Sequence, residues 1–224
     1  MDIMVNESNL YLLIRVSAEK DVRLLHFSPF PFRPGLLSEE DQKSYRLVEI
    51  HCSGENQDDN HGPKHTGTMP GNRLVYKKHR DMRTTQGRKL EIEMEDAGLV
   101  VVSHWQFYDG IPIVRSWTEV RNESNTVRGL EYVSSFALTG ISKEGLLPWD
   151  HKSRLYIPHH PWFGEGQWRQ YTLPELGLSK VMDFSLKRVA CSNTGSWSTS
   201  QYLPMGCYEN IECGSLLFWQ IEHN

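Results

Sequence analysis

Between residues 90 and 95 the chain alternates strictly between apolar and acidic side chains, and this pattern limits the fold more than any other feature. Leu90, Ile92 and Met94 are each followed by a glutamate. Successive side chains of a β-strand point to opposite faces, so this segment buries one face and leaves the other in water. We therefore expect a half-buried strand here, in a sheet with one solvated face.

The strand pattern continues as an expected antiparallel meander over residues 88–139. Asp96-Ala97-Gly98 breaks the alternation, and Asp109-Gly110 is the dipeptide that a type I′ hairpin turn favours, because both of its central residues need a positive φ. A further polar turn is expected at 122–125. The first strand predicted for the meander begins at residue 88. The other three are predicted to span 99–108, 111–120 and 127–139.

Short apolar segments on both sides of the meander also have the length and content of strands. They span 10–16, 22–27, 45–52, 184–190 and 215–223. Helix signals are limited to single turns at 38–41 and 173–176, and residues 73–86 are ambiguous. Many short strands without strand–helix alternation predict an all-β fold, an antiparallel β-supersandwich of two large packed sheets with at most short helical turns. Without a clear linker or repeat, we expect a single domain over 1–224.

Charge and hydropathy exclude several classes of partner. The net charge is −4, from 24 basic and 28 acidic residues, so the chain lacks the basic field that attracts nucleic acid. No apolar run reaches the roughly 20 residues that cross a bilayer, so no membrane partner is expected. The first 20 residues lack the features of a signal peptide, which predicts a cytoplasmic protein.

The sequence also predicts that the chain carries no cofactor and no metal. The four cysteines fit no ligand spacing and are interpreted as reduced thiols. His61 and His65 have the spacing of a ligand pair on a helix, but Gly62 and Pro63 between them oppose a helix. Glycine-rich phosphate loops and a GxSxG serine motif are missing from the sequence.

Two long polar stretches, 53–71 and 148–177, are the places where binding residues are expected. The first contains Asp58-Asp59, but adjacent aspartates rarely reach the two-sided placement of about 5–10 Å that glycoside hydrolysis needs. The second places Trp149 and Trp162 beside carboxylates, a combination that suits sugars because C–H faces stack on rings and hydroxyls bind charged acceptors. Buried packing is the alternative explanation of these tryptophans.

Taken in order, several segments of the chain resemble the N-terminal domain of glycoside hydrolase family 36, the α-galactosidase (melibiase) family. The resemblance spans nearly the full chain, and the block from Leu90 to Asn122 carries most of it. The segments are LLHF at Leu24, GENQDD at Gly54, LEIEMEDAGLVVVSHWQFYDGIPIVRSWTEVRN at Leu90, YVSSFALTG at Tyr132, PWFGEGQWR at Pro161 and SNTGSWSTSQYLP at Ser192.

The resemblance implies a supersandwich that is followed, in the full enzyme, by a (β/α)₈ barrel with both catalytic aspartates. The implied partners are that catalytic barrel of the same full-length enzyme, further copies in a homo-oligomer, and a carbohydrate substrate, an α-galactoside. No catalytic residue is assigned to this chain. Pro148-Trp149-Asp150 has proline where the family's nucleophile motif has lysine, so we interpret it as unrelated.

The family also extends a loop with an Asp-x-Arg sequence toward the substrate, and the matching stretch here is 58–65. Its substrate-proximal residues would be Asp58, Asp59, His61 and Lys64. The stretch departs from the pattern, because histidine stands where the family has arginine. Neither His61 nor Lys64 has the planar fork of a guanidinium group, so the specificity of this loop is open.

Two other functions remain as alternatives. A stand-alone mutarotase-like enzyme would place a histidine acid and a glutamate base on one concave sheet. A carbohydrate-binding module would bind sugar through Trp162 or Trp149. The last expected strand stays apolar up to Ile221 and the sequence stops at Asn224, which predicts a chain truncated within a longer protein and favours the glycosidase domain.

Overall fold

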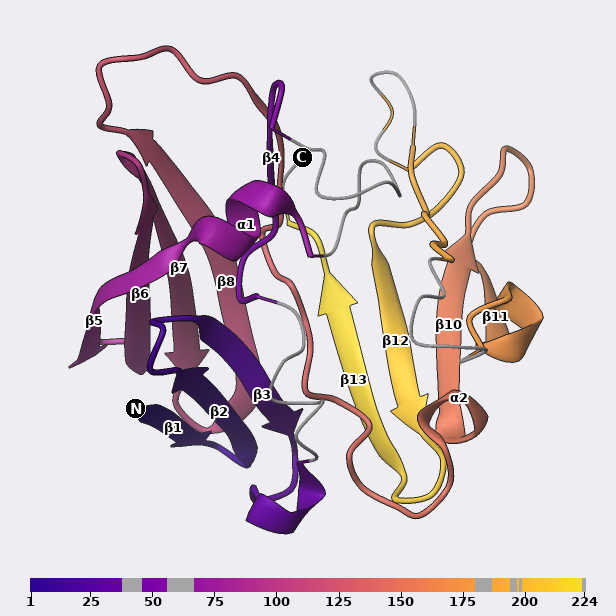
Figure 1. Cartoon of the computed structure of the whole chain (residues 1–224). Coiled ribbons are helices and arrows are strands. Elements are labelled where there is room, and N and C mark those ends of the chain that lie inside the picture. The colour runs from indigo at the N-terminus through magenta and orange to yellow at the C-terminus, as the bar shows by residue number, and fades with distance from the viewer. Residues whose placement is uncertain (38–45, 56–66, 180–186, 194–196, 198, 223–224) are drawn as a thin grey trace. The chain divides into compact units, whose positions relative to one another are not determined.

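The computed structural model describes residues 1–37, 46–55, 67–179, 187–193, 197 and 199–222. They form two compact units, Met1–Ile141 and Ser142–Asn224. Both units consist of antiparallel sheets joined by turns, and the described helices are short (Figure 1). The predicted all-β class is confirmed. The expectation that residues 1–224 act as one domain stays a prediction.

The first unit contains three antiparallel sheets, ordered β1-β2-β3, β5-β6-β7-β8 and β4-β9. Its strands are β1 (Asp2–Glu7), β2 (Leu10–Val16), β3 (Val22–Ser28), β4 (Ile50–Cys52), β5 (Val75–Arg83), β6 (Arg88–Asp96), β7 (Leu99–Tyr108), β8 (Ile111–Asn122) and β9 (Leu130–Val133), with short helices η1 (Pro34–Leu36) and α1 (Met69–Arg73). The ambiguous segment 73–86 is therefore mainly the edge strand β5.

The alternation in β6 places its apolar side chains in the core of this unit. Leu90, Ile92 and Met94 are buried, whereas the glutamates between them are partly exposed. The core extends to β3 through Phe136, whose ring makes edge contacts with Phe27 and Trp105 at centroid distances of 5.8 and 5.2 Å. The aromatic contacts therefore join the β1–β3 sheet to the buried face of the β5–β8 sheet.

Two hairpin turns in this unit have the type I′ geometry, but they are not at the predicted place. Ser8 and Asn9 between β1 and β2, and Ala97 and Gly98 between β6 and β7, all have positive φ. In the Asp109-Gly110 turn between β7 and β8 only the glycine has positive φ, and the pairing shifts after Phe107. The predicted type I′ turn is therefore wrong, because an irregular register allows another turn geometry.

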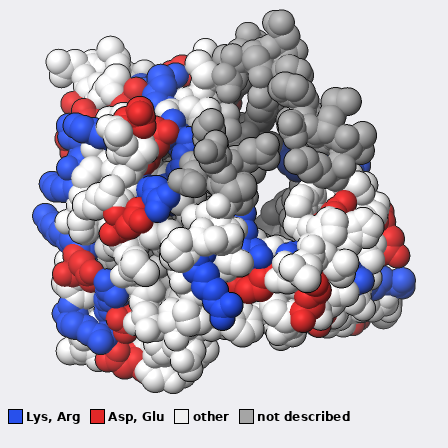
Figure 2. Space-filling view, turned by 60° about the horizontal axis from the view of Figure 1, so that its bottom comes forward, with Lys and Arg blue, Asp and Glu red and all other residues white. Residues whose placement is uncertain are grey.

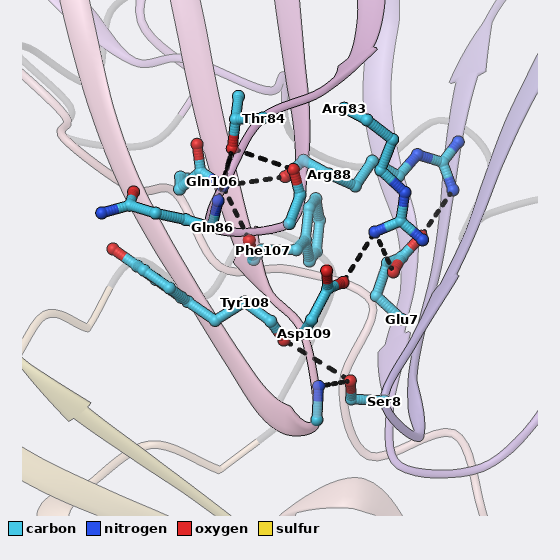
Figure 3. A network of polar contacts seen from close by, with 12 residues as sticks. Glu7, Ser8, Arg83, Thr84, Gln86, Arg88, Gln106, Phe107, Tyr108 and Asp109 are labelled. Carbon is cyan, nitrogen blue, oxygen red and sulfur yellow. Dashed lines mark hydrogen bonds and ion pairs between the residues drawn. The ribbon is translucent and has the colours of Figure 1, made fainter.

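A polar network ties the β1–β2 hairpin to the ends of β5 to β8 (Figure 3). Glu7 accepts contacts from Arg83 at 3.4 Å and Arg88 at 3.5 Å. The Ser8 hydroxyl donates to the Tyr108 carbonyl at 3.4 Å and accepts the Gly110 N–H at 3.0 Å. Each contact joins residues that are roughly 80 to 100 positions apart in the sequence. Together they connect the β1–β3 sheet to one end of the β5–β8 sheet.

The second unit is a single four-stranded antiparallel sheet ordered β11-β10-β12-β13. Its elements are α2 (Trp149–Lys152), β10 (Ser153–His159), β11 (Gln167–Thr172), η3 (Pro174–Leu176), β12 (Met205–Asn210) and β13 (Ser215–Gln220). Among the described residues of this unit, Ile157 and Tyr208 are the large hydrophobic side chains that are buried, with 7% and 8% of their surface exposed. Buried polar groups, such as Ser153 and Asn210, make up much of the rest of its interior.

Several predicted boundaries are corrected by the structure. The segment 127–139 forms a strand only at β9, which pairs with β4 rather than β8, so the meander does not extend to 139. The stretch 148–177 is not a long loop, because it contains β10 and β11. Residues 187–190 have no strand, and the segments 38–41 and 184–186 lie outside the described residues.

Candidate functional site

The predicted substrate-proximal residues Asp58, Asp59, His61 and Lys64 lie outside the described part of the chain, as does His65. The structure does show both ends of the stretch that contains them. Each end is anchored by a carboxylate, one on Glu55 and one on Glu49.

Glu55 anchors the N-terminal end of this stretch through two arginines. The Arg128 Nη2 group donates to both of its carboxylate oxygens, at 2.8 and 2.9 Å, and Arg73 donates to one of them. Arg73 also donates to Asp96 at 2.9 Å. Partial burial acts to raise the pKa of Glu55, but the hydrogen bonds and charges of the two arginines outweigh it and hold the pKa below its ordinary value. Glu55 is therefore a stable anion.

Glu49 anchors the C-terminal end from a fully buried position. One carboxylate oxygen accepts the Gly67 N–H at 2.8 Å, and the other accepts the Thr68 N–H at 2.9 Å and its hydroxyl at 2.8 Å. The Glu49 residue is only 2% exposed. A buried carboxylate needs such donors to offset its lost hydration, so this position is built to hold the chain at Gly67 and Thr68.

The outer face of the β5–β8 sheet carries a pocket of about 280 Å³ that sequence reasoning did not identify. Acidic and basic residues from neighbouring strands line it in cross-strand pairs. They include Lys78, Arg80, Glu91, Glu93, His104, Glu119 and Arg121. Figure 2 shows the same mixture of signs over the face that it presents, without a large area of one charge. In the sequence, the only signal for this surface was the glutamates of β6, which alternate with the buried apolar residues and were expected to face solvent.

His104 lines this pocket and lies between two carboxylates. Its Nδ1 and Nε2 atoms lie 3.2 Å from carboxylate oxygens of Glu91 and Glu119 respectively. The Trp117 ring stacks on the imidazole with centroids 4.8 Å apart and planes 4° apart, and His104 is only 7% exposed. Both ring nitrogens therefore face carboxylates of the protein itself.

The carboxylates around this histidine are stabilised as anions. A hydrogen bond from Lys89 is the main cause that lowers the pKa of Glu91, and one from Arg121 does the same for Glu119. A general acid for glycoside hydrolysis needs the opposite, a carboxyl group whose pKa is raised. The pocket therefore suits polar contacts better than acid catalysis.

An exposed aromatic cluster lies in the second unit, at the loop between β10 and β11. We call it the aromatic surface and define it as Trp162, Phe163 and Trp197, which are 67%, 90% and 58% exposed. The Trp162 ring lies 5.7 Å from that of Phe163 and 5.3 Å from that of Trp197. The sequence pointed to Trp162 alone, because Trp197 is more than 30 positions further along the chain.

Trp149, the other predicted stacking residue, is at the start of α2 and is 43% exposed. Within the described residues no ring contact joins it to the aromatic surface. The structure therefore groups Trp162 with two new partners and leaves Trp149 apart from them.

All four cysteines are free. In the described ranges, no group of three or more His, Cys, Asp or Glu side chains is arranged to hold a metal ion. None of the helices that the structure describes has the length and apolar content to span a membrane.

Comparison with family models and with curated proteins gives no match to this sequence. Solved structures do match. The GH36 alpha-galactosidase AgaB from Geobacillus stearothermophilus superposes with a TM-score of 0.55 at 11% identity, over 93% of this chain and 31% of that chain. The GH36 alpha-galactosidase AgaA from the same organism superposes with a TM-score of 0.54 at 11% identity, over 93% of this chain and 32% of that chain.

The comparison with the two enzymes shows a shared β fold, because the identity is too low to show more. The chain spans about a third of the length of the enzymes that it matches. A variant of AgaA has been solved in complex with raffinose and matches over the same share of this chain, 93%.

Proposed function

We propose that this chain is the non-catalytic N-terminal β-sandwich domain of an α-galactosidase-like glycoside hydrolase that acts on α-galactosides. One observation carries the proposal: the fold match takes in 93% of this chain but only 31% of the solved enzyme. In this proposal the catalytic barrel of the full-length enzyme is the main partner. The domain supports that barrel, takes part in contacts of a homo-oligomer and contributes the loop 53–71 to the substrate site. A cytoplasmic location is part of the same proposal.

The electrostatics of three carboxylates near the candidate sites support a non-catalytic role. Glu55, Glu91 and Glu119 all have pKa values held below their ordinary range by neighbouring basic groups. Groups of this kind are anions at neutral pH and do not protonate a leaving oxygen. The anchored ends of the loop, at Glu55 and Glu49, fit a segment that must be presented in a defined position.

An activity assay tests the non-catalytic role directly. The purified 224-residue chain is incubated with p-nitrophenyl α-galactoside, and release of nitrophenol is followed by absorbance. We expect no turnover above the buffer rate. Sustained turnover that remains after repeated chromatography would contradict the proposal.

The reading frame of the source DNA tests the assignment to a larger enzyme. Continuation of the frame beyond codon 224 into a segment of about 250 residues or more, with alternating strands and helices, is the expected result. A stop codon at that point would rule out the proposed barrel as part of the same polypeptide.

The mutarotase-like alternative is favoured by one observation, the placement of His104 between Glu91 and Glu119 on one sheet face. However, its two ring nitrogens already face these carboxylates, and Trp117 covers the ring. Polarimetry distinguishes the two functions, because a mutarotase accelerates the optical change of freshly dissolved α-galactose. We expect no acceleration by this chain, and an acceleration that His104→Gln abolishes would favour the alternative.

A further inference from the structure

The aromatic surface of the second unit is unusual because three large rings stay in water beside one another. Isolated exposed apolar residues are common, whereas contiguous patches of a few hundred Å² mark binding sites on soluble proteins. Trp162, Phe163 and Trp197 each expose more than half of their surface. An aromatic side chain has roughly 150–250 Å² to bury, so the three together reach that size.

The loop that presents two of these rings is held by local hydrogen bonds. The Gly164 N–H donates to the Pro161 carbonyl at 2.9 Å and the Phe163 N–H donates to the Glu165 carboxylate at 3.1 Å. The Gly166 N–H donates to Nδ1 of His160 at 3.1 Å. Three contacts within seven residues therefore fix the backbone between β10 and β11.

Phe163 is also held in a backbone conformation that a phenylalanine rarely adopts. Its φ is 60°, in the left-handed region, which is unfavourable for a residue with a Cβ. Strain of this kind is concentrated at functional sites. The loop thus keeps a strained residue and turns its ring almost wholly into solvent, with 90% of the residue exposed.

Polar groups next to the rings supply hydrogen-bonding capacity. His160 accepts the Gly166 N–H through Nδ1, so in the neutral ring the proton is on Nε2, which is then a donor. Glu165 uses one oxygen for the Phe163 N–H and has a second carboxylate oxygen as an acceptor. Rings that offer apolar faces and flanking groups that donate and accept are the two requirements of sugar binding.

We propose that the aromatic surface, together with His160 and Glu165, is a binding site for a pyranose unit of an oligosaccharide. The choice of a galactoside rests on the proposed function. It also fits the chemistry, because the axial hydroxyl of galactose leaves several C–H groups together on one face of the ring. That face stacks on Trp162 or Trp197, whose planes are inclined by 40°.

Fluorescence and calorimetric titration of the purified chain test this site. Raffinose, which carries a galactose unit, is the probe, maltose is the glucose-containing comparison and mannitol is the polyol without a ring. We expect a saturable change of tryptophan fluorescence and of heat with raffinose, at least about tenfold weaker binding of maltose and none of mannitol.

Variants of the loop locate the effect. Trp162→Ala and Phe163→Ala should weaken raffinose binding by about tenfold or more, because each removes a stacking surface. Trp117→Ala is the matched control, since it removes a partly exposed tryptophan of the first unit and should leave the affinity unchanged. Circular dichroism checks that each variant keeps its β-structure.

Three outcomes would overturn the proposal. They are the absence of any saturable signal with raffinose, binding that survives Trp162→Ala at full strength, and equal binding of maltose. The last outcome contradicts the galactoside class. None of these measurements depends on hydrolysis or on the reading frame, so failure here is distinct from failure of the proposed glycosidase domain.

Discussion

Glu49 shows how a single buried side chain can set the position of a neighbouring segment. Its carboxylate satisfies the N–H groups of Gly67 and Thr68 and the Thr68 hydroxyl, and its own N–H donates to the Ser134 hydroxyl. The surroundings leave no spare room, since a Cβ on Gly71 would come within 2.5 Å of the Thr68 hydroxyl. Nothing in the sequence around Glu49 distinguishes it from an exposed glutamate.

Replacing Glu49 by alanine should lower the free energy of unfolding by about 2–4 kcal/mol. The change leaves several buried donors without an acceptor, and each unsatisfied donor is costly. Urea unfolding followed by fluorescence measures the effect. Glu123→Ala, at an exposed carboxylate, is the control and should cost less than about 1 kcal/mol. A loss for Glu49→Ala as small as that of the control would show that the network contributes little.

The ion pair between Asp81 and Arg88 leads us to expect that the free energy of unfolding depends on pH. Hydrogen bonds from Arg88 are the main cause that lowers the pKa of Asp81, burial opposes them, and the charge of Arg88 adds to them. Because the folded pKa lies below the unfolded one, this stabilisation is complete above the unfolded value near 4 and is lost as pH falls through the folded value.

Asp81→Asn should therefore be less stable than the wild type near pH 7, and the difference should shrink at lower pH. The Asp81 side chain is 37% exposed, so the difference should stay under about 1 kcal/mol. Urea titrations across the acid range measure it. A difference that is independent of pH would show that the charge of Asp81 is not involved.

At the scale of elements, the sequence predicted the strands that carry long apolar runs or an alternation of apolar and charged residues, and it missed several shorter or more polar strands. β2, β3, β6 and β7 fall close to their predicted ranges because their apolar residues are buried, alternately in β6 and almost continuously in β7. β10, β11 and β12 were missed because their segments are rich in polar and aromatic residues, as their many partly exposed positions show. Such strands depend on their neighbours for stability rather than on their own pattern.

The turn between β6 and β7 offers a matched pair of substitutions. Ala97 has a φ of 49°, a conformation that glycine adopts without strain, so Ala97→Gly should stabilise the chain by about 0.5–1 kcal/mol. Gly98→Ala should destabilise it, since Gly98 has a φ of 82° and a Cβ there would lie 2.9 Å from the Ser124 Cβ. Thermal unfolding of both variants checks the opposite signs, and two shifts in the same direction would contradict the assigned turn.

At the scale of the whole molecule, the hydrophobic core is distributed unevenly between the two units. The first unit buries long apolar rows from β2, β3, β6 and β7. In the described part of the second unit, Ile157 and Tyr208 are the buried large hydrophobic side chains, and neither is fully buried. A segment of fewer than 100 residues with so little apolar burial rarely offsets its conformational entropy.

Separate expression of the two units should therefore give different results. Residues 1–141 should fold, with a β-type circular dichroism spectrum and dispersed amide resonances. Residues 142–224 alone should remain unfolded by the same measurements. A cooperative unfolding transition of the isolated second unit would contradict this expectation, and would also count against a single domain over residues 1–224.

The sequence by itself determined the all-β class and the buried faces of the best-patterned strands, because alternation is a local property of neighbouring residues. Only the tertiary structure decided that β9 pairs with β4, that Glu49 holds Gly67 and Thr68, and that Trp162 meets Trp197. These contacts join positions far apart in the chain, and their partners are selected by the packing of the whole unit, which a local pattern does not encode.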